Sequence, residues 1–361
     1  MTIRLALAAM ALGVPGGTLA QDVPTTAPAV DTAAIMTRAD VAKFDGAILI
    51  GEADGGYLIL TPGTAPVASD AVSRWASITK QLAAVIAMQQ VAKGALDLDA
   101  PVTRYWPEWK APEGSKIRIR DLLLHNSGLP QPDTSEADGD GVPGFYRAQA
   151  VAPAESAAGF CAGPARGTPP ANYDYNNCDT IVLAEVLRRT TGSDFAALVR
   201  DRIATPLGMT SLGLYPLGGK PGHVLPTGEY ADLDPLLNLG VYGASGGAYG
   251  TIGDLWRFDH ALLDGTLLPD AARETMWKSE RSNGFYGFQQ WIFPAKLAGC
   301  GAETRVVERQ GQIAGFEHRN YLLPESGRAV IFFSRHRPAD YGDPWEGKGF
   351  AYDVLSMVNC G

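Results

Sequence analysis

The chain has 361 residues, and its 39 Asp and Glu residues against 30 Lys and Arg residues give a net charge of −9. An acidic chain without basic runs is poorly suited to nucleic acid or to anionic lipid surfaces, so we expect no nucleic-acid partner. The length suits one large domain or a two-lobed unit with a sizeable core.

Residues 1–20 have the pattern of a secretory signal peptide. Arg4 gives a positive start, residues 5–14 form an apolar run, and Thr18-Leu19-Ala20 closes the segment like a cleavage site. Because this run is shorter than the ~20 apolar residues of a membrane-spanning helix, and no later stretch approaches that length, we expect no membrane span. The sequence therefore predicts an exported protein, either periplasmic or secreted.

Residues 21–40 are predicted to be a leader segment rich in Pro, Thr and Ala, and residues 41–361 to be the folded domain. Apolar runs at residues 46–50 and 57–60 flank Ala53-Asp54-Gly55-Gly56, which predicts a β-hairpin. Apolar residues at helical spacing then predict further helices, at residues 77–93, 118–125, 179–190, 193–203 and 251–263.

Residues 131–172 differ in composition from the segments on either side. They are rich in Pro, Gly, Asp and Ala, which predicts a long loop insertion of the kind that often binds substrate. Its acidic residues lack the final glutamate of an EF-hand loop, so we interpret them as a solvated loop and not as a calcium site. These residues are Asp133, Glu136, Asp138 and Asp140.

The last ninety residues change to strand patterns, which predict strands at residues 287–293, 305–309, 316–323 and 328–334. Glu325-Ser326-Gly327 predicts a hairpin turn between the last two, and residues 349–358 predict a closing helix. This order predicts a mixed α/β fold. An antiparallel sheet flanked by helices is built from both ends of the chain, and a mostly helical lobe is inserted between them.

The chain contains four cysteines, and an exported protein meets an oxidising compartment, so disulfides are expected. Three pairings are possible. Proximity in the sequence favours Cys161–Cys178 and Cys300–Cys360. No CxxC pair is present, so the cysteines do not predict a zinc site.

Ser77-Ile78-Thr79-Lys80 lies where coil enters a predicted helix. A serine hydroxyl needs a base within hydrogen-bond reach, and residues three apart share one face of a helix, so Lys80 can reach Ser77. The positive potential of the helix N-terminus favours an alkoxide on Ser77, and burial would lower the pKa of Lys80. The alternative is a helix-capping serine followed by an exposed lysine.

The segments around this motif resemble the serine β-lactamase and penicillin-binding protein superfamily, from about Phe44 to Ser334. The closest groups are the class C β-lactamases, the D-Ala-D-Ala carboxypeptidases and the family VIII esterases. The resemblance implies a β-lactamase/transpeptidase-like fold and a serine hydrolase with Ser77 as nucleophile. It is carried by Trp75-Ala76-Ser77-Ile78-Thr79-Lys80, Asp121-Leu122-Leu123-Leu124-His125-Asn126-Ser127-Gly128-Leu129-Pro130, Pro206-Leu207-Gly208-Met209 and Gly246-Gly247-Ala248-Tyr249.

The second motif of that superfamily is Tyr-x-Asn, and Tyr175-Asn176-Asn177 matches it ahead of a predicted helix. The resemblance implies that Tyr175 shares proton transfer with Lys80 and that Asn177 contacts Lys80 and the substrate. A tyrosine can do this only if nearby cations lower its pKa from about 10. Tyr173 is a competing candidate, but only Tyr175 has an asparagine two places later.

The third motif departs from the superfamily. Where Lys-Thr-Gly or His-x-Gly is usual, this chain has Arg309-Gln310-Gly311-Gln312. The resemblance implies that Arg309 binds a substrate carboxylate and that Gly311 allows close approach of the strand. It also implies that the backbone N–H groups of Ser77 and Gln312 form the oxyanion hole. An ordinary surface arginine is the alternative, and the departure weakens the case for β-lactam turnover.

A rival motif, Gly243-Ala244-Ser245-Gly246-Gly247, matches the G-x-S-x-G elbow of α/β-hydrolases. That elbow needs a buried strand before it and a helix directly after it, and neither is predicted here, so we interpret it as a pocket-lining turn. The five histidines have no metal-ligand spacing, and His125 is interpreted as structural. No metal and no cofactor are expected.

The expected reaction has four steps and one covalent intermediate. Lys80 and Tyr175 deprotonate Ser77, Ser77 attacks a carbonyl, the leaving group departs, and water hydrolyses the acyl-enzyme. The substrate is expected to be an amide or ester, such as a D-amino acid peptide, a cell-wall fragment or a β-lactam. An esterase and a catalytically silent binding protein remain as alternatives, and the oligomeric state is left open.

Overall fold

The computed structural model describes residues 30–361, apart from residues 65–66, 138, 148–150, 220–224, 226, 280–284 and 338–339. The predicted signal peptide and residues 21–29 of the predicted leader lie outside the described residues. Among the described residues, no helix has both the length and the apolar character needed to cross a membrane.

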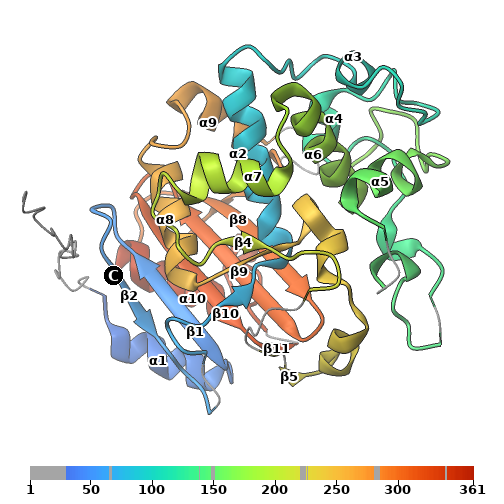
Figure 1. The fold of residues 1–361 in the computed structure, drawn as a ribbon. Coiled ribbons are helices and arrows are strands. Elements are labelled where there is room, and N and C mark those ends of the chain that lie inside the picture. Colours follow the sequence, from blue (N-terminus) through green and yellow to red (C-terminus); the bar gives the residue numbers. More distant parts are fainter. Residues whose placement is uncertain are drawn as a thin grey trace, which may run out of the picture.

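A six-stranded antiparallel sheet forms the centre of the fold, with the strand order β2-β1-β10-β9-β8-β7. The first two strands come from the start of the chain and the other four from its end, so the predicted sheet built from both ends is confirmed (Figure 1). The strands are β1 (Gly46–Gly51), β2 (Tyr57–Leu60), β7 (Trp291–Ala295), β8 (Thr304–Ile313), β9 (Phe316–Leu323) and β10 (Arg328–Ser334).

Both faces of the sheet are covered, which explains why β1 has an uninterrupted apolar sequence. Successive side chains of a strand point to opposite faces. Ile48 and Ile50 pack with α1 (Thr32–Val41) and α10 (Phe350–Cys360), whereas Ala47 and Leu49 pack with the helices on the other face. That other face includes α8 (Ile252–Leu263), which contacts β1 and β10.

Helix α1 corrects the predicted domain boundary. From Thr32 onward the chain is not a leader, because Ile35 and Ala39 are fully buried against the sheet and α10. These two residues lie four apart and therefore share a helix face. Asp31 caps the helix by accepting a hydrogen bond from the backbone N–H of Ala34 at 3.0 Å. The Ala-rich composition of the segment concealed this short apolar stripe.

The inserted region forms the predicted helical lobe, which lies above the sheet in Figure 1 and extends to its right. Its longest helix, α6, begins after the capping residue Asn176 and ends at Gly192, which has a φ of 77°. The helices are α2 (Thr79–Ala92), α3 (Val102–Tyr105), α4 (Ile119–Leu123), α5 (Pro153–Ala158), α6 (Asn177–Thr191), α7 (Phe195–Val199) and α9 (Asp270–Met276).

Two small sheets complete the described fold. One has the order β3-β6-β4 and the other pairs β5 with β11. Strand β3 matters for the site because it leads directly into the segment that contains Ser77. The strands are β3 (Ser73–Arg74), β4 (Gly213–Leu214), β5 (Thr227–Gly228), β6 (Ala248–Gly250) and β11 (His336–Arg337).

Some predicted boundaries are wrong. The strand predicted at residues 287–293 begins only at Trp291, because Gln289 has a φ of 63° and its backbone N–H donates to the carbonyl of Leu123. The helix predicted at residues 118–125 ends at Leu123, close before His125, whose φ is 55°. Left-handed backbone conformations of this kind interrupt regular structure and have no reliable signature in non-glycine residues.

The predicted insertion at residues 131–172 contains several short helices. These are α5 and the single turns Pro132–Thr134, Gly144–Tyr146 and Phe160–Ala162. The disulfide Cys161–Cys178 ties the segment to the first turn of α6, and Cys300–Cys360 ties the end of α10 to the sheet region. Both disulfide pairings are those predicted from the sequence.

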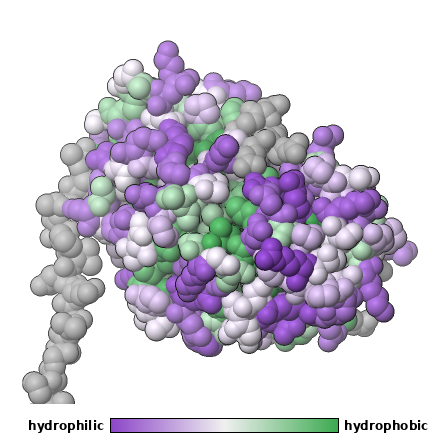
Figure 2. Space-filling model, turned by 90° about the horizontal axis from the view of Figure 1, so that it is seen from above, coloured by the Kyte–Doolittle hydropathy of each residue, from purple (hydrophilic) through white to green (hydrophobic). Residues whose placement is uncertain are grey.

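The surface seen from above the view of Figure 1 is mixed in character. Apolar side chains gather near the middle of this face, between strongly hydrophilic ones (Figure 2). Charged side chains at the surface form ion pairs with each other, as for Arg120 with Asp99 and Arg305 with Glu274. Exposed pairs of this kind contribute little to stability.

Candidate active site

Ser77 lies in a single helical turn, Ala76–Ile78, between β3 and α2. The small sheet fixes this turn, because the backbone N–H of Trp75 donates to the carbonyl of Ala248 at 2.8 Å. The hydroxyl of Thr79 accepts from the N–H of Ala248 at 3.0 Å and donates to the carbonyl of Ala76 at 2.6 Å. Ala76 has a φ of 49°. A strained backbone beside a candidate nucleophile is a frequent feature of functional sites.

Lys80 is fully buried beneath Ser77. Its Nζ lies 3.3 Å from Ser77 Oγ and donates to Asn177 Oδ1 at 2.7 Å and to the carbonyl of Ser245 at 2.5 Å. Burial lowers the pKa of Lys80 to about 8, with Tyr175 opposing that shift and Arg309 adding to it. The alternative of an exposed lysine is therefore excluded, and Ser77 makes no side-chain cap of α2.

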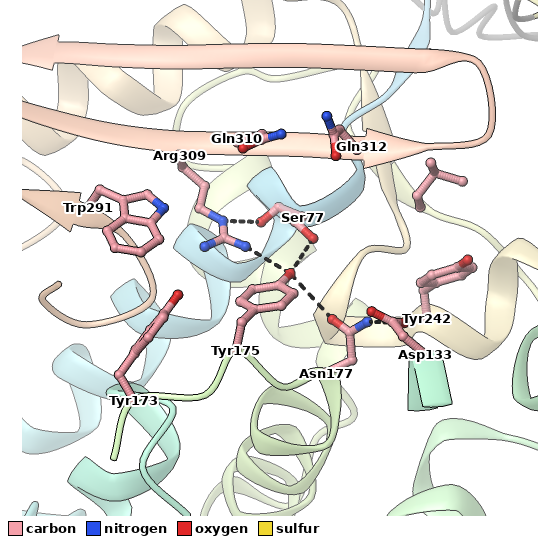
Figure 3. Close-up of a pocket in the computed structure, with 11 residues that line it drawn as sticks. Ser77, Asp133, Tyr173, Tyr175, Asn177, Tyr242, Trp291, Arg309, Gln310 and Gln312 are labelled. Atoms are coloured by element: carbon pink, nitrogen blue, oxygen red, sulfur yellow. Dashed lines mark hydrogen bonds between the residues drawn. The ribbon is translucent and has the colours of Figure 1, made fainter. Parts of the chain in front are cut away.

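Tyr175 completes a short cluster with Ser77. Its hydroxyl is 2.6 Å from Ser77 Oγ and accepts a hydrogen bond from Arg309 Nη2 at 2.9 Å (Figure 3). Burial alone raises the pKa of Tyr175, but the positive charges of Lys80 and Arg309 outweigh burial, and the pKa is lowered from its usual value. Burial raises the pKa of Tyr173 instead, so of these two tyrosines only Tyr175 has a lowered pKa.

Asn177 is held by residues of the 131–172 segment. Its Nδ2 donates to the hydroxyl of Tyr146 at 2.7 Å and to Asp133 Oδ1 at 3.2 Å, which turns Oδ1 toward Lys80. Its backbone N–H donates to Gln131 Oε1 at 3.1 Å. These three partners were not predicted as site residues. Asp133 drew attention only as part of an acidic loop, because side-chain contacts across 31 to 46 residues leave no local pattern.

Arg309 points from β8 toward Ser77 and is 3% exposed. Its Nε donates to the carbonyl of Ser77 at 2.9 Å, Nη2 to Tyr175, and Nη1 to the hydroxyl of Tyr286 at 3.3 Å. The alternative of an ordinary surface arginine is excluded. Each of its three nitrogens is directed at the protein, and its positive charge lowers the pKa of Tyr175. The expected binding of a substrate carboxylate stays a prediction.

Residues 309–313 of β8 form an edge that faces Ser77. Strand β7 pairs with β8 only up to the pair Trp291–Glu308, so beyond Glu308 the strand has β9 on one side and the Ser77 turn near the other. Gln310 and Gln312 line a cavity of about 350 Å³ that also contains Ser77, Tyr175 and Asn177 (Figure 3). The cavity is thus lined by the predicted residues Ser77, Tyr175, Asn177, Arg309, Gln310 and Gln312, and Lys80 is buried beneath Ser77.

Gly311 permits the close approach of β8 to the Ser77 turn. A Cβ at this position would lie 2.4 Å from the carbonyl oxygen of Trp75, which is backbone and cannot rotate away. We expect Gly311→Ala to move β8 and to lower the rate by about 100-fold, since a 1 Å displacement in an active site can cost that much. The measurement is Ser77 acylation kinetics together with the melting temperature.

The matched control for that variant is Gly301→Ala, because nothing lies within 4 Å of a Cβ built there. Equal effects of the two substitutions would contradict the role assigned to Gly311.

The rival Ser245 is 1% exposed, and its Oγ donates to the carbonyl of Tyr242 at 2.7 Å. Its own carbonyl accepts a hydrogen bond from Lys80, so this turn forms a wall of the site and presents no nucleophile to the cavity.

His125 is buried beside Tyr175, with Nδ1 2.9 Å from Asp179 Oδ2. Burial lowers the pKa of His125 well below its usual value, and Lys80 and Arg309 add to this, so a structural role fits it. In the described part of the chain, no three His, Cys, Asp or Glu side chains are grouped to hold a metal ion.

Comparison with known proteins places this chain in a family. The family model described as Beta-lactamase matches residues 28–346. The chain belongs to this family, and by class it is a serine hydrolase. The extended match agrees with the resemblance seen around Ser77 and Tyr175.

Two curated relatives are similar over most of the chain. Esterase EstB of Burkholderia gladioli is 29% identical over 296 residues, covering 73% of this chain and 70% of that protein. The putative penicillin-binding protein PbpX of Bacillus subtilis is 27% identical over 269 residues. The match covers 72% of this chain but only 60% of the length of PbpX. A solved D-stereospecific amidohydrolase from Streptomyces sp. has a TM-score of 0.72 at 24% identity, covering 91% of this chain and 99% of that chain. This last likeness shows the fold alone.

Proposed function

We propose that the protein is an exported hydrolase that forms an acyl-enzyme on Ser77 with an amide or ester substrate. One observation carries the proposal: Ser77 Oγ lies 2.6 Å from the hydroxyl of Tyr175 and 3.3 Å from Nζ of Lys80, at an open cavity. Two groups with lowered pKa values beside one hydroxyl supply the base that a serine nucleophile requires.

In the acylation step, Lys80 and Tyr175 share the proton of Ser77. As the bond from Ser77 Oγ to the substrate carbonyl carbon forms, that proton passes to the pair, and Tyr175 then donates a proton to the departing nitrogen or oxygen. The backbone N–H groups of Ser77 and Gln312 are proposed to hold the oxyanion, a contribution typically worth 10²–10³-fold for each donor. Deacylation reverses these roles, with Tyr175 activating water.

Asn177 and Arg309 are proposed to set the electrostatics of this step. Asn177 holds Nζ of Lys80 within reach of Ser77, and Asp133 and Tyr146 fix the orientation of its amide. Arg309 stabilises the phenolate form of Tyr175 through a charge-assisted hydrogen bond. Gln310 and Gln312, on the strand edge, are proposed to contact the substrate.

The proposed substrates are D-amino acid peptides, cell-wall fragments or β-lactam-like amides. The D-stereospecific amidohydrolase, which shares the fold, and the penicillin-binding relative support this class. An esterase is the second candidate, favoured by the relative named esterase EstB and by Arg309-Gln310-Gly311 in place of the usual third motif. A silent binding protein is disfavoured, because a scaffold without turnover has no need of a buried lysine with a lowered pKa.

One experiment separates these candidates. The mature protein is treated with a fluorophosphonate and with a labelled penicillin, and any adduct is located by mass spectrometry. We expect labelling at Ser77. Capture of penicillin supports the amidase class, and ester turnover without penicillin capture supports the esterase. Labelling of Ser245 with Ser77 untouched would contradict the proposal, and no labelling by either probe would favour the binding protein.

The pH dependence of acylation tests the assigned bases. Lys80 has its pKa lowered to about 8, so its neutral form predominates only above that pH. We expect the acylation rate to rise as the pH is raised through about 8. The apparent pKa belongs to the coupled pair of Lys80 and Tyr175 and not to one group. The measurement is stopped-flow acylation by an activated ester across this range, and a rate that stays flat would contradict the assignment.

A further inference from the structure

A second cavity adjoins the one that contains Ser77. It has a volume of about 460 Å³ and shares three lining residues with the Ser77 cavity, namely Tyr173, Trp291 and Gln310. The shared residues lie near Trp291, the first residue of β7, where the pairing of β7 with β8 stops. The two cavities therefore meet around the start of β7. A substrate bound at Ser77 can therefore extend into the second cavity. We call it the aromatic cavity.

The walls of the aromatic cavity are mostly ring systems from separate parts of the chain. Trp291 lies 5.3 Å from Tyr173 between ring centroids, and Phe293 lies 5.8 Å from Trp345 in an edge-to-face arrangement. Trp345, in the single turn Pro344–Glu346, is 42% exposed. A large ring left open beside other aromatic rings can gain buried area and ring contacts by covering a planar ligand.

The floor of the cavity is polar and already paired. Arg319 Nη1 lies 2.7 Å from Glu308 Oε1, and Arg319 Nη2 lies 3.2 Å from Glu317 Oε1. Glu308 is only 2% exposed, so this ion pair is fixed in place. Nε of Arg319 is buried without a hydrogen-bond partner among the described residues. The floor is therefore rigid and its charged groups are paired with each other, so the aromatic walls provide the contact surface for a ligand.

The position of Tyr175 indicates which part of a substrate enters this cavity. In the proposed reaction the leaving atom must take its proton from the hydroxyl of Tyr175, which hydrogen-bonds Ser77 at 2.6 Å, Arg309 at 2.9 Å and Asn177 at a longer 3.4 Å. Figure 3 shows Trp291 and Tyr173 on the Arg309 side of Tyr175, whereas Asp133 and Tyr242 lie on the opposite side, near Asn177. A leaving group that departs on the Arg309 side of Tyr175 is directed toward Trp291 and the aromatic cavity.

We propose that the aromatic cavity binds a planar aromatic group on the leaving portion of the substrate. This inference rests on the proposed acyl-enzyme at Ser77. In the step it serves, the bond from Ser77 Oγ to the carbonyl carbon forms, and the bond from that carbon to the leaving oxygen or nitrogen breaks. The serine proton reaches the leaving atom through Tyr175, and the aromatic leaving group stays in the cavity until it dissociates.

The test uses two phosphonate probes that transfer the same phosphonyl group to Ser77 and differ only in the leaving group. One releases fluoride and the other releases 2-naphtholate, so the adducts have identical masses and only the rates differ. We expect Trp345→Ala to slow modification by the naphthyl probe by about tenfold, the usual order for loss of an aromatic contact. The fluoride probe should be unaffected, and Trp345→Phe should retain most of the naphthyl rate.

Each other outcome overturns a specific claim. Unchanged rates with both probes, or equal slowing of both, remove the aromatic cavity from leaving-group binding. A third probe places the naphthyl group on the phosphonyl portion and releases fluoride, and selective slowing of that probe assigns the cavity to the acyl portion instead. If the wild-type protein forms no Ser77 adduct with any probe, the proposed function itself fails. The melting temperatures of the variants show whether each variant is folded.

Discussion

Replacing Ser77 with alanine is expected to reduce hydrolysis by about 10⁴-fold or more, because it removes the atom that forms the acyl-enzyme and leaves only binding and oxyanion contacts. The loss should appear in kcat, with the substrate still bound. Ser77 Oγ is the atom that lies beside Tyr175 and Lys80 and that a fluorophosphonate would modify. Because alanine has no Oγ, the variant is also expected to lose all labelling at this position.

The matched control is Ser245→Ala, which removes the serine of the rival motif. Its hydroxyl bonds only the carbonyl of Tyr242 among the described residues, so we expect less than about a tenfold change, the order of one neutral hydrogen bond. Mass spectrometry of intact protein after a short exposure to ester checks both variants. An acyl adduct that persists in Ser77→Ala and disappears in Ser245→Ala would reverse the assignment of the nucleophile.

Arg309→Met is the second substitution with a large expected effect. It removes a buried positive charge that lowers the pKa of both Tyr175 and Lys80, so both pKa values should rise. We expect a loss of about 10²–10³-fold near neutral pH, comparable to the removal of one preorganised donor. The pH at which acylation becomes fast should move upward, so that part of the loss is recovered in alkaline buffer.

Arg309→Lys separates charge from geometry. Lysine keeps the positive charge but lacks the planar fork that reaches Ser77, Tyr175 and Tyr286 together. Its pH profile should stay close to that of the wild type while the rate falls. If Arg309 acted only on a substrate carboxylate, both variants would raise KM for acidic substrates and leave the pH profile unchanged, and this result would contradict the electrostatic role.

Local patterns predicted the regular elements well where apolar spacing was clear. The strands at residues 316–323 and 328–334 match β9 and β10 in the structure. Strand β8 was predicted only to residue 309, because Gln310-Gly311-Gln312 interrupts the apolar alternation, and these residues extend the strand to Ile313 along the site. The polar residues Gln310 and Gln312, at which the predicted strand stopped, are the ones that line the cavity.

The candidate site was predictable to the extent that its residues lie in short motifs. Ser77, Lys80, Tyr175 and Asn177 lie together as the motifs imply. The contacts of Asp133, Tyr146 and Tyr286 depend on how distant segments pack, which no local pattern encodes. The inward direction of Arg309 was open for the same reason, because an arginine on a strand can face solvent or a buried tyrosine with an identical sequence.

The disulfide Cys161–Cys178 gives assembly of the active site a chemical precondition. Cys178 directly follows Asn177 in the first turn of α6, and its partner lies in the segment whose Gln131, Asp133 and Tyr146 hold Asn177. Closing this bond therefore joins the two sides of the Asn177 contact network covalently. A reduced chain is expected to keep the same nucleophile but to hold Asn177, the partner of Lys80, less firmly. For the exported protein proposed above, full activity is thus expected only after this bond has been oxidised.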